Sequence, residues 1–383
     1  MRRWFSPSRN EPTAAADASE AARQCAGRAA RLDNGVIVAK RKPSYVCTRL
    51  RVKGQPKGGA AMSPVSLPPV DSTPRITDMP EDRQAQVAAL VALLRQPGAR
   101  WTEIAAEVLA EGSALAVLYR HLGAGETLFA EDPARDALNG ARTELQAWAA
   151  DGIGVHSLFD DTYPARLRDI HQMPPIVFTR GTLAEDRRAV AVVGTRRPSD
   201  QGVGIAETCA TALAESGITV VSGLAAGIDT AAHTAALRAG GRTVAVIGTG
   251  VNRYYPATNR ALQDQIVKDG LVLSQFWPDA PPGKHTFPMR NAVMSGYAAA
   301  TVVVEAAYRS GARMQARLAL QHGRPVVLAD SLLQHDWARE YATRPGVYVV
   351  STANELVATV DLIVRQIPDS LQALEGLPRL VDL

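Results

Sequence analysis

The feature that most constrains this sequence is an alternation of short, fully apolar runs with amphipathic segments between residues 189 and 328. Strands that are apolar at every position are typical of a parallel sheet covered by helices on both faces, because neither face of such a strand meets water. The alternation therefore predicts an α/β fold with a Rossmann-like, doubly wound, mostly parallel sheet. The expected strands are Ala189–Val193, Thr219–Ser222, Thr243–Ile247, Leu271–Ser274, Ala300–Val304 and Pro325–Leu328.

Helices are expected between these strands, at Gly202–Ser216, Asp229–Ala239, Asn259–Lys268, Arg290–Tyr297 and Ala312–His322. Two short strands, Gly154–Leu158 and Ile176–Phe178, are expected before the repeat.

Four regions are expected along the chain. Residues 1–79 are rich in Ala, Arg, Pro, Gly and Ser and show no sustained period, which is typical of a disordered tail. Residues 80–152 place apolar side chains at helical spacing and predict a small all-α domain. Residues 153–350 contain the Rossmann-like domain, and residues 351–383 add a C-terminal helix (Asn354–Arg365) and a tail.

Positive charge is concentrated in the tail. Residues 1–60 hold 13 Lys/Arg and 4 Asp/Glu, so within the chain total of +4 the other 323 residues carry −5. One interpretation is a basic arm that adds affinity for nucleic acid. The other is a start codon assigned too early, with Met62 or Met79 as the true start. In either case the globular part must bind nucleic acid through a local patch, because its net charge provides no general attraction.

Several classes of protein are excluded by the composition. The segment MRRWFSPSRN lacks an apolar signal core, and no run of about 18 apolar residues occurs. Cys25, Cys47 and Cys209 show neither disulfide-like nor metal-like spacing. We therefore expect a cytoplasmic protein that makes no membrane contact and holds no metal or cofactor.

The turn after the first strand of the repeat is a candidate phosphate site. Gly194 opens a turn that runs through Arg196, Arg197 and Ser199 into a helix. Ligands of open parallel sheets bind beyond the carboxyl ends of the strands. Glycine lets an anion approach the backbone, the helix start offers free N–H groups, and arginines pair with phosphate. The alternative for such a glycine turn is tight packing alone.

The turn after the second strand is also rich in glycine and contains Ser222, Gly223 and Gly227. Asp229 follows it and is either a helix cap or a ligand. His233 lies one turn later and is interpreted as a packing residue rather than a catalyst.

A long loop after the fourth strand carries Lys284 and Phe287 and leads to Arg290 and Asn291. Basic residues interleaved with aromatic residues suit single-stranded nucleic acid, because cations follow the phosphates while rings stack on bases. A lid packed by its own aromatic side chains is the alternative. Glu305, after the fifth strand, is expected to pair with an arginine or to contact a ribose. We find no nucleophile–base pair, carboxylate pair or metal cluster at these junctions, so a binding protein is favoured over an enzyme.

Several blocks in order resemble the DNA-processing protein A (DprA/Smf) family. They are DDTYPARLRDIHQMPPIVFTRG, AVVGTRRPSDQG, VVSGLAAGIDTAAHTAAL, GGRTVAVIGTGVNRYYPATNRAL, HTFPMRNAVMSG and VVVEAAYRSGARMQARLALQHGRPV. Together they span about Asp160–Leu328, nearly half of the chain.

The resemblance implies a cytoplasmic homodimer that binds single-stranded DNA, protects incoming strands and helps to load RecA-type recombinase during natural transformation. It implies no established catalytic activity. It places DNA contacts at Arg196, Ser222, Gly223, Gly227, Phe287, Arg290 and Asn291.

The chain departs from the family pattern at Ala226, Ala292 and the turn 311–316, which removes positive charge and bears on the strength of DNA binding. A divergent branch that acts in phage defence or mobile-element biology is an alternative. A phosphoribohydrolase-like enzyme is another, although its P-G-G-x-G-T-x-x-E signature is absent. A dinucleotide oxidoreductase is disfavoured because Gly194-Thr195-Arg196 breaks the G-x-G-x-x-G motif.

Overall fold

The computed structural model of the chain describes residues 81–123 and 132–366. The tail predicted for residues 1–79 and the end of the chain after residue 366 lie outside the described residues.

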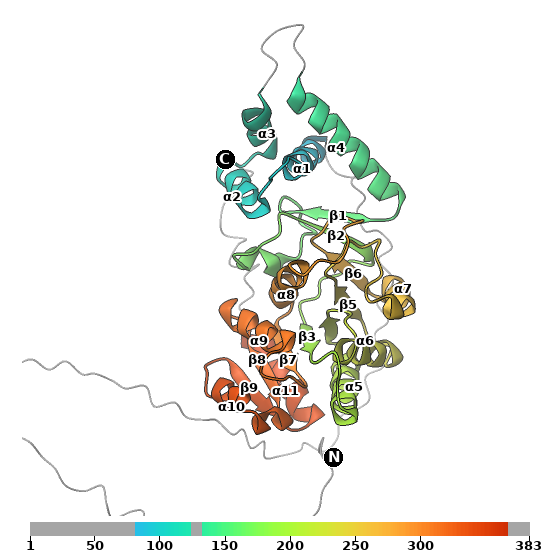
Figure 1. Cartoon of the computed structure of the whole chain (residues 1–383), viewed down its shortest axis with the longest axis vertical. Coiled ribbons are helices and arrows are strands. Elements are labelled where there is room, and N and C mark those ends of the chain that lie inside the picture. The colour runs from blue at the N-terminus through green and yellow to red at the C-terminus, as the bar shows by residue number, and fades with distance from the viewer. Residues whose placement is uncertain (1–80, 124–131, 367–383) are drawn as a thin grey trace, which may run out of the picture. The chain divides into compact units, whose positions relative to one another are not determined.

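A sheet of nine strands organises the described part of the chain (Figure 1). Its order is β1-β2-β6-β5-β4-β3-β7-β8-β9. The strands from β6 to β9 pair in parallel, while β2 and β1 join the β6 edge in antiparallel orientation. The predicted Rossmann-like, mostly parallel fold is therefore confirmed. The strands are β1 (Gly154–Ser157), β2 (Ile176–Gly181), β3 (Ala189–Val193), β4 (Thr219–Ser222), β5 (Thr243–Val246), β6 (Leu271–Ser274), β7 (Ala300–Val303), β8 (Val326–Ala329) and β9 (Val347–Val350).

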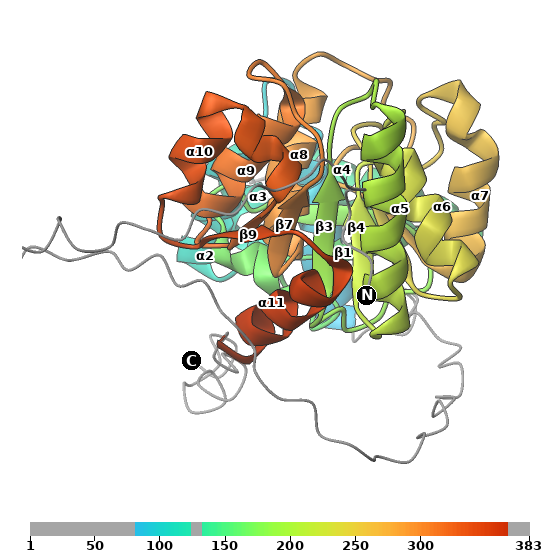
Figure 2. The same ribbon diagram turned by 90° about the horizontal axis from the view of Figure 1, so that it is seen from below.

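Helices cover both faces of this sheet. Figure 2 shows α5 and α6 on one face and α8, α9 and α10 on the other. The helices of this α/β part are α5 (Asp200–Glu215), α6 (Ile228–Arg238), α7 (Arg260–Asp269), α8 (Thr286–Tyr297), α9 (Gly311–Gln321), α10 (Asp336–Ala342) and α11 (Ala353–Gln366). Short 3₁₀ turns occur at η2 (Ala165–Asp169), η3 (Ala257–Asn259) and η4 (Asp330–Gln334). Among the described residues, no helix is both long and apolar enough to cross a membrane.

The strand order reverses at β3. The chain adds β4, β5 and β6 on one side of β3 and then returns to add β7, β8 and β9 on the other. Right-handed crossovers that run in opposite directions place their helices on opposite faces. The loops after β3 and β7 therefore leave the sheet toward different faces at its carboxyl edge, which is the edge where ligands of such folds bind.

Two parts of the sequence prediction needed correction. The helix expected from Arg290 begins four residues earlier, at Thr286, so Pro288 lies in its first turn. Proline is tolerated there because the N–H groups of a first turn have no intrahelical acceptor. The sequence prediction also missed α10 and β9, which have only seven and four residues. Helix α10 makes only about two turns, too few to show a helical period. Strand β9 is the edge of the sheet and only Val350 of its residues is buried, unlike the fully buried strands that were predicted.

Four helices precede the sheet: α1 (Glu81–Leu94), α2 (Trp101–Glu111), α3 (Ala114–Leu122) and α4 (Pro133–Ala150). Gly112, with φ of 73°, ends α2, and Gly123, with φ of 79°, ends α3. The buried side chains of these helices form one hydrophobic cluster with residues of the sheet. At this contact the ring of Trp148 lies 5.2 Å from Phe178 of β2, and Trp101 lies 5.0 Å from Trp277. The helical region is therefore anchored on the β2 edge of the sheet.

His156 makes the stability of this edge sensitive to pH. Its Nδ1 lies 2.9 Å from the Thr162 hydroxyl and its Nε2 lies 3.0 Å from the Thr179 hydroxyl. Burial lowers the pKa of His156 to about 4. An unfolded histidine takes up a proton below about pH 6.5. The contribution of neutral, buried His156 to the free energy of unfolding is therefore fully present above about pH 6.5 and is lost as the pH falls from about 6.5 toward about 4.

We expect His156 to cost the protein about 2 kcal/mol of unfolding free energy between about pH 7 and about pH 5. Urea unfolding at the two pH values measures this loss. The variant His156→Gln should show a pH dependence that is weaker by about one proton. An unchanged pH dependence in the variant would mean that other groups are responsible.

Candidate nucleic-acid interface

The glycine turns after β3 and β4 pack backbone against backbone. A Cβ on Gly227, which has φ of +87°, would lie 2.5 Å from the Thr195 carbonyl oxygen. The N–H of Ile228 donates to that same oxygen at 3.2 Å. A Cβ on Gly194 would lie 2.4 Å from Cγ1 of Ile228. Close packing therefore explains why glycine stands at both positions, which were predicted as phosphate contacts.

An exposed cation in the turn after β3 lies close to two aromatic rings. The guanidinium of Arg196 lies 5.3 Å from the ring centroid of Phe287, at the start of α8. The ring of Tyr255, from the loop after β5, lies 5.5 Å from Phe287 with an interplanar angle of 40°. Phe287 rests on Gly248, where a Cβ would lie 2.8 Å from the ring. We call this group the Arg196–Phe287–Tyr255 stack.

Two further predicted cations are exposed on the segments that form this stack. Arg197 follows Arg196 in the turn after β3, and Lys284 lies shortly before α8. Together with Arg196 they place three exposed positive side chains on the loops at the carboxyl edge of the sheet. Such a surface suits a ligand with both phosphates and flat apolar rings.

Arg290, in contrast, is buried beneath the turn after β4. Its side chain is only 5% exposed, and Nη1 donates to the Val246 carbonyl at 2.8 Å. A Cβ on Gly223 would lie 1.6 Å from that Nη1, so the guanidinium fits directly under the glycine. Arg290 therefore supports the turn from below in this structure, and its predicted contact with DNA stays a prediction.

Asp229 also stabilises the turn after β4, through hydrogen bonds to its backbone. Its carboxylate accepts the N–H groups of Gly223 at 3.2 Å and Ala225 at 3.3 Å. Burial raises the pKa of Asp229, while the nearby Arg290 lowers it. Burial likewise lowers the pKa of Arg290, while Asp229 raises it and Arg196 lowers it. Asp229 is thus a structural residue that holds the glycine turn and compensates a buried cation, rather than the helix cap considered from the sequence.

Two other predicted contacts are also below the surface. The Ser222 hydroxyl is fully buried and donates to the Val192 carbonyl at 2.7 Å, which joins β4 to β3. Asn291 is 7% exposed in α8. Among the predicted residues, Arg196, Arg197, Ser199 and Lys284 are therefore exposed, and Gly194, Gly227 and Phe287 are half-buried. Ser222, Gly223, Arg290 and Asn291 are buried.

The start of α5, which the sequence predicts as a phosphate site, holds the protein's own carboxylate. Glu305 accepts the N–H of Ser199 at 3.1 Å and its hydroxyl at 2.8 Å. The Ser199 hydroxyl in turn accepts the N–H of Gly202 as the helix cap. A Cβ on Gly202 would lie 1.8 Å from the Glu305 carboxylate. A phosphate binds at this helix start only if Glu305 gives way, so the arginine side chains are the better anion ligands.

The predicted site residues do not include Tyr255, which lies in the segment Arg253–Pro256. Three of the residues in that segment are exposed, and the sequence does not tell which of its rings faces Phe287. His233, in agreement with its interpretation as a packing residue, is fully buried and bonded through Nδ1 to the Thr243 hydroxyl at 2.7 Å.

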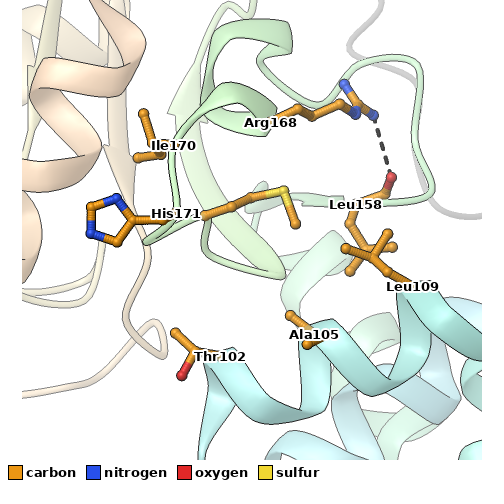
Figure 3. A pocket seen from close by; sticks show the side chains of 9 residues that line it. Thr102, Ala105, Leu109, Leu158, Arg168, Ile170 and His171 are labelled. Atoms are coloured by element: carbon orange, nitrogen blue, oxygen red, sulfur yellow. Dashed lines mark hydrogen bonds between the residues drawn. The ribbon is translucent and has the colours of Figure 1, made fainter. Parts of the chain in front are cut away.

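A cavity of about 340 Å³ is formed by other segments, between α2 and the chain that follows β1 (Figure 3). Arg168 and His171 are among its lining residues, and the Arg168 guanidinium donates to the carbonyls of Leu158, Asp160 and Tyr163. These bonds leave the guanidinium poorly suited to bind an anion, and the cavity is not part of the interface.

Comparison with known proteins identifies relatives of the chain. The family model for DNA recombination-mediator protein A matches residues 155–361. The DNA processing protein DprA of Streptococcus pneumoniae is 45% identical over 171 residues, which are 44% of this chain and 60% of that protein. A putative DprA of Mycobacterium tuberculosis is 34% identical over 252 residues, or 62% of this chain and 65% of that protein. The chain spans between half and two thirds of the length of these curated relatives.

Solved structures agree with this result. The crystal structure of the Streptococcus pneumoniae protein has a TM-score of 0.54 and 31% identity, covering 72% of this chain and 95% of that one. A DNA processing protein A structure from Helicobacter pylori has a TM-score of 0.50 at 24% identity, covering 55% of this chain and 96% of that one, and shows the shared fold. The matched family model, together with the loops that carry the predicted motifs, shows that the chain belongs to the DNA recombination-mediator protein A (DprA/Smf) family.

Proposed function

We propose that this chain binds single-stranded DNA across the loops at the carboxyl edge of its sheet. The observation that supports this most directly is the Arg196–Phe287–Tyr255 stack, in which a cation and two rings from two loops and the start of α8 lie together. Unpaired bases expose flat faces that stack on aromatic rings, while arginine and lysine neutralise the phosphates between them. A duplex hides the faces of its bases, so the surface favours single strands.

The buried residues around the turn after β4 have a supporting role in this proposal. Arg290 and Asp229 support the turn after β4. Gly227 and Ile228, at the end of this turn, contact the carbonyl of Thr195, the residue before Arg196. A rigid platform binds more tightly because less conformational entropy is lost on binding. The Helicobacter pylori relative, whose structure is described for its single-stranded DNA binding mode, is consistent with this use of the fold.

We further propose that the protein protects incoming strands during DNA uptake and helps RecA-type recombinase to coat them, acting as a homodimer in the cytoplasm. The family name, DNA recombination-mediator protein A, supports the recombination role. The proposal requires no catalytic step and no cofactor.

Removing the cation of the stack is expected to weaken binding. Arg196→Ala should lower the affinity for an unstructured oligonucleotide about 10- to 100-fold, because it removes a phosphate partner and the cation above Phe287. It should also reduce the slope of log affinity against log salt by about 0.7, the value for one phosphate contact on a single strand. Fluorescence anisotropy at two salt concentrations, with single- and double-stranded probes, measures both quantities.

The matched control is Arg142→Ala, an exposed arginine on α4 outside the interface. It should bind like the unchanged protein. If Arg196→Ala also binds like the unchanged protein, or if duplex DNA is preferred, the proposed interface is wrong.

A further inference from the structure

The loop after β7 presents another exposed aromatic ring. Tyr308 is 63% exposed, more than any other large apolar or aromatic side chain among the described residues. The guanidinium of Arg313, in the first turn of α9, lies 4.1 Å from the Tyr308 ring centroid. Arg313 also donates to the Tyr308 carbonyl at 3.1 Å. The exposed ring is therefore held from one side by a cation on a helix.

Arg313 is itself fixed by the core. Its guanidinium lies 5.9 Å from the ring centroids of both Trp337 and Tyr341, which are 2% and 3% exposed. Its Nε atom is buried and has no hydrogen-bond partner in the described structure. A cation removed from water in this way interacts more strongly with an aromatic face. Of the three rings around Arg313, Tyr308 is the one available to a ligand.

This ring belongs to the same edge of the sheet as the Arg196–Phe287–Tyr255 stack. Strand β7 pairs in parallel with β3, so the loops that follow them are neighbours. The N–H of Thr195 donates to the Glu305 carbonyl at 2.8 Å, and Glu305 also binds Ser199. Tyr308 and the exposed Arg309 follow three and four residues after Glu305. Arg196 of the first stack and Tyr308 therefore lie on two neighbouring loops that meet at the Ser199–Glu305 contact.

We propose that Tyr308, backed by Arg313, is a second base-stacking position for single-stranded DNA, beyond the Arg196–Phe287–Tyr255 stack. This inference rests on the proposed function. The Glu305 carboxylate repels phosphate, so the strand passes over the start of α5 without binding there and is held on both sides. One base stacks on Tyr308, and Arg309 neutralises an adjacent phosphate. The second position lengthens the strand that one protein molecule contacts.

The experiment measures affinity against oligonucleotide length. Oligothymidylates from about 4 to about 16 nucleotides span the range that one such platform contacts. Tyr308→Ala should weaken binding of the long oligonucleotides about 5- to 100-fold and leave that of the shortest unchanged. Tyr308→Phe keeps the ring and should bind like the unchanged protein. A fluorescent base, 2-aminopurine, can be placed at successive positions along a long strand, where stacking on a ring quenches its fluorescence. Tyr308→Ala should abolish this quenching at the positions near one end of the strand and leave it unchanged elsewhere.

Two controls separate folding from binding. Leu109→Ala removes an exposed apolar side chain on α2 and should alter neither binding nor quenching. Thermal unfolding of Tyr308→Ala should match that of the unchanged protein, because the ring is largely exposed.

Three other results would overturn the proposed second stacking position. If Tyr308→Ala matches the unchanged protein at every length while Arg196→Ala is weakened, the second position is wrong and the proposed function stands. If Tyr308→Ala is equally weak at every length, Tyr308 belongs to the first stack and the inference is overturned. If the unchanged protein binds no oligonucleotide, the proposed function fails and this inference fails with it.

Discussion

Replacing Arg290 with methionine is expected to lower the free energy of unfolding by about 3 kcal/mol. The guanidinium lies under the turn after β4, and the Asp229 carboxylate beside it is 6% exposed. Removing the cation leaves a buried carboxylate without its compensating charge, and the Val246 carbonyl loses its donor. The affinity for single-stranded DNA should fall as well, because the turn loses its support. Urea unfolding and fluorescence anisotropy measure the two effects.

The double variant Arg290→Met/Asp229→Asn tests the cause. It removes both charges and should recover most of the lost stability. Arg197→Met is the matched control, since Arg197 is exposed in the same interface, and it should stay within about 0.5 kcal/mol of the unchanged protein. If Arg290→Met is as stable as the unchanged protein but no longer binds DNA, Arg290 contacts the strand directly, as the sequence predicts.

Gly223→Ala is expected to have an effect of similar size by adding one methyl group. Its Cβ would lie 1.6 Å from Nη1 and 2.3 Å from Cζ of Arg290. Arg290 has little freedom to move because its Nη1 is bonded to the Val246 carbonyl and the side chain is buried. Overpacking of this kind costs about 1–3 kcal/mol of stability. Displacement of the turn should also lower the affinity for single-stranded DNA at least about 10-fold.

Gly204→Ala provides the comparison within the same fold. Gly204 lies inside α5, and no heavy atom lies within 4 Å of its added Cβ. Alanine there should stabilise the protein by about 0.5–1 kcal/mol, because glycine disfavours a helix. Wild-type stability and binding in Gly223→Ala would show that the turn and Arg290 adjust freely, and the supporting role of Arg290 would have to be abandoned.

The sequence alone determined the architecture and the family. Strands that are apolar on both faces, separated by amphipathic helices, specify a covered parallel sheet, and their positions follow from local patterns. The sequence also located the turns at Gly194 and Gly223, because strand ends and helix starts are marked by local residue patterns. The short helix α10 and the edge strand β9 were missed.

Only the tertiary structure decided which residues of those turns face a ligand. Arg196 and Arg290 are both basic residues in family motifs, yet one is exposed and the other is 5% exposed. The occupation of the α5 start by Glu305 depends on a partner 106 residues away, and the anchoring of Arg290 on one 44 residues away. Tyr255 belongs to the stack because its ring contacts Phe287 of α8. Burial and pairing across such distances in the sequence arise from the packing of the sheet and its helices, which local residue patterns do not encode.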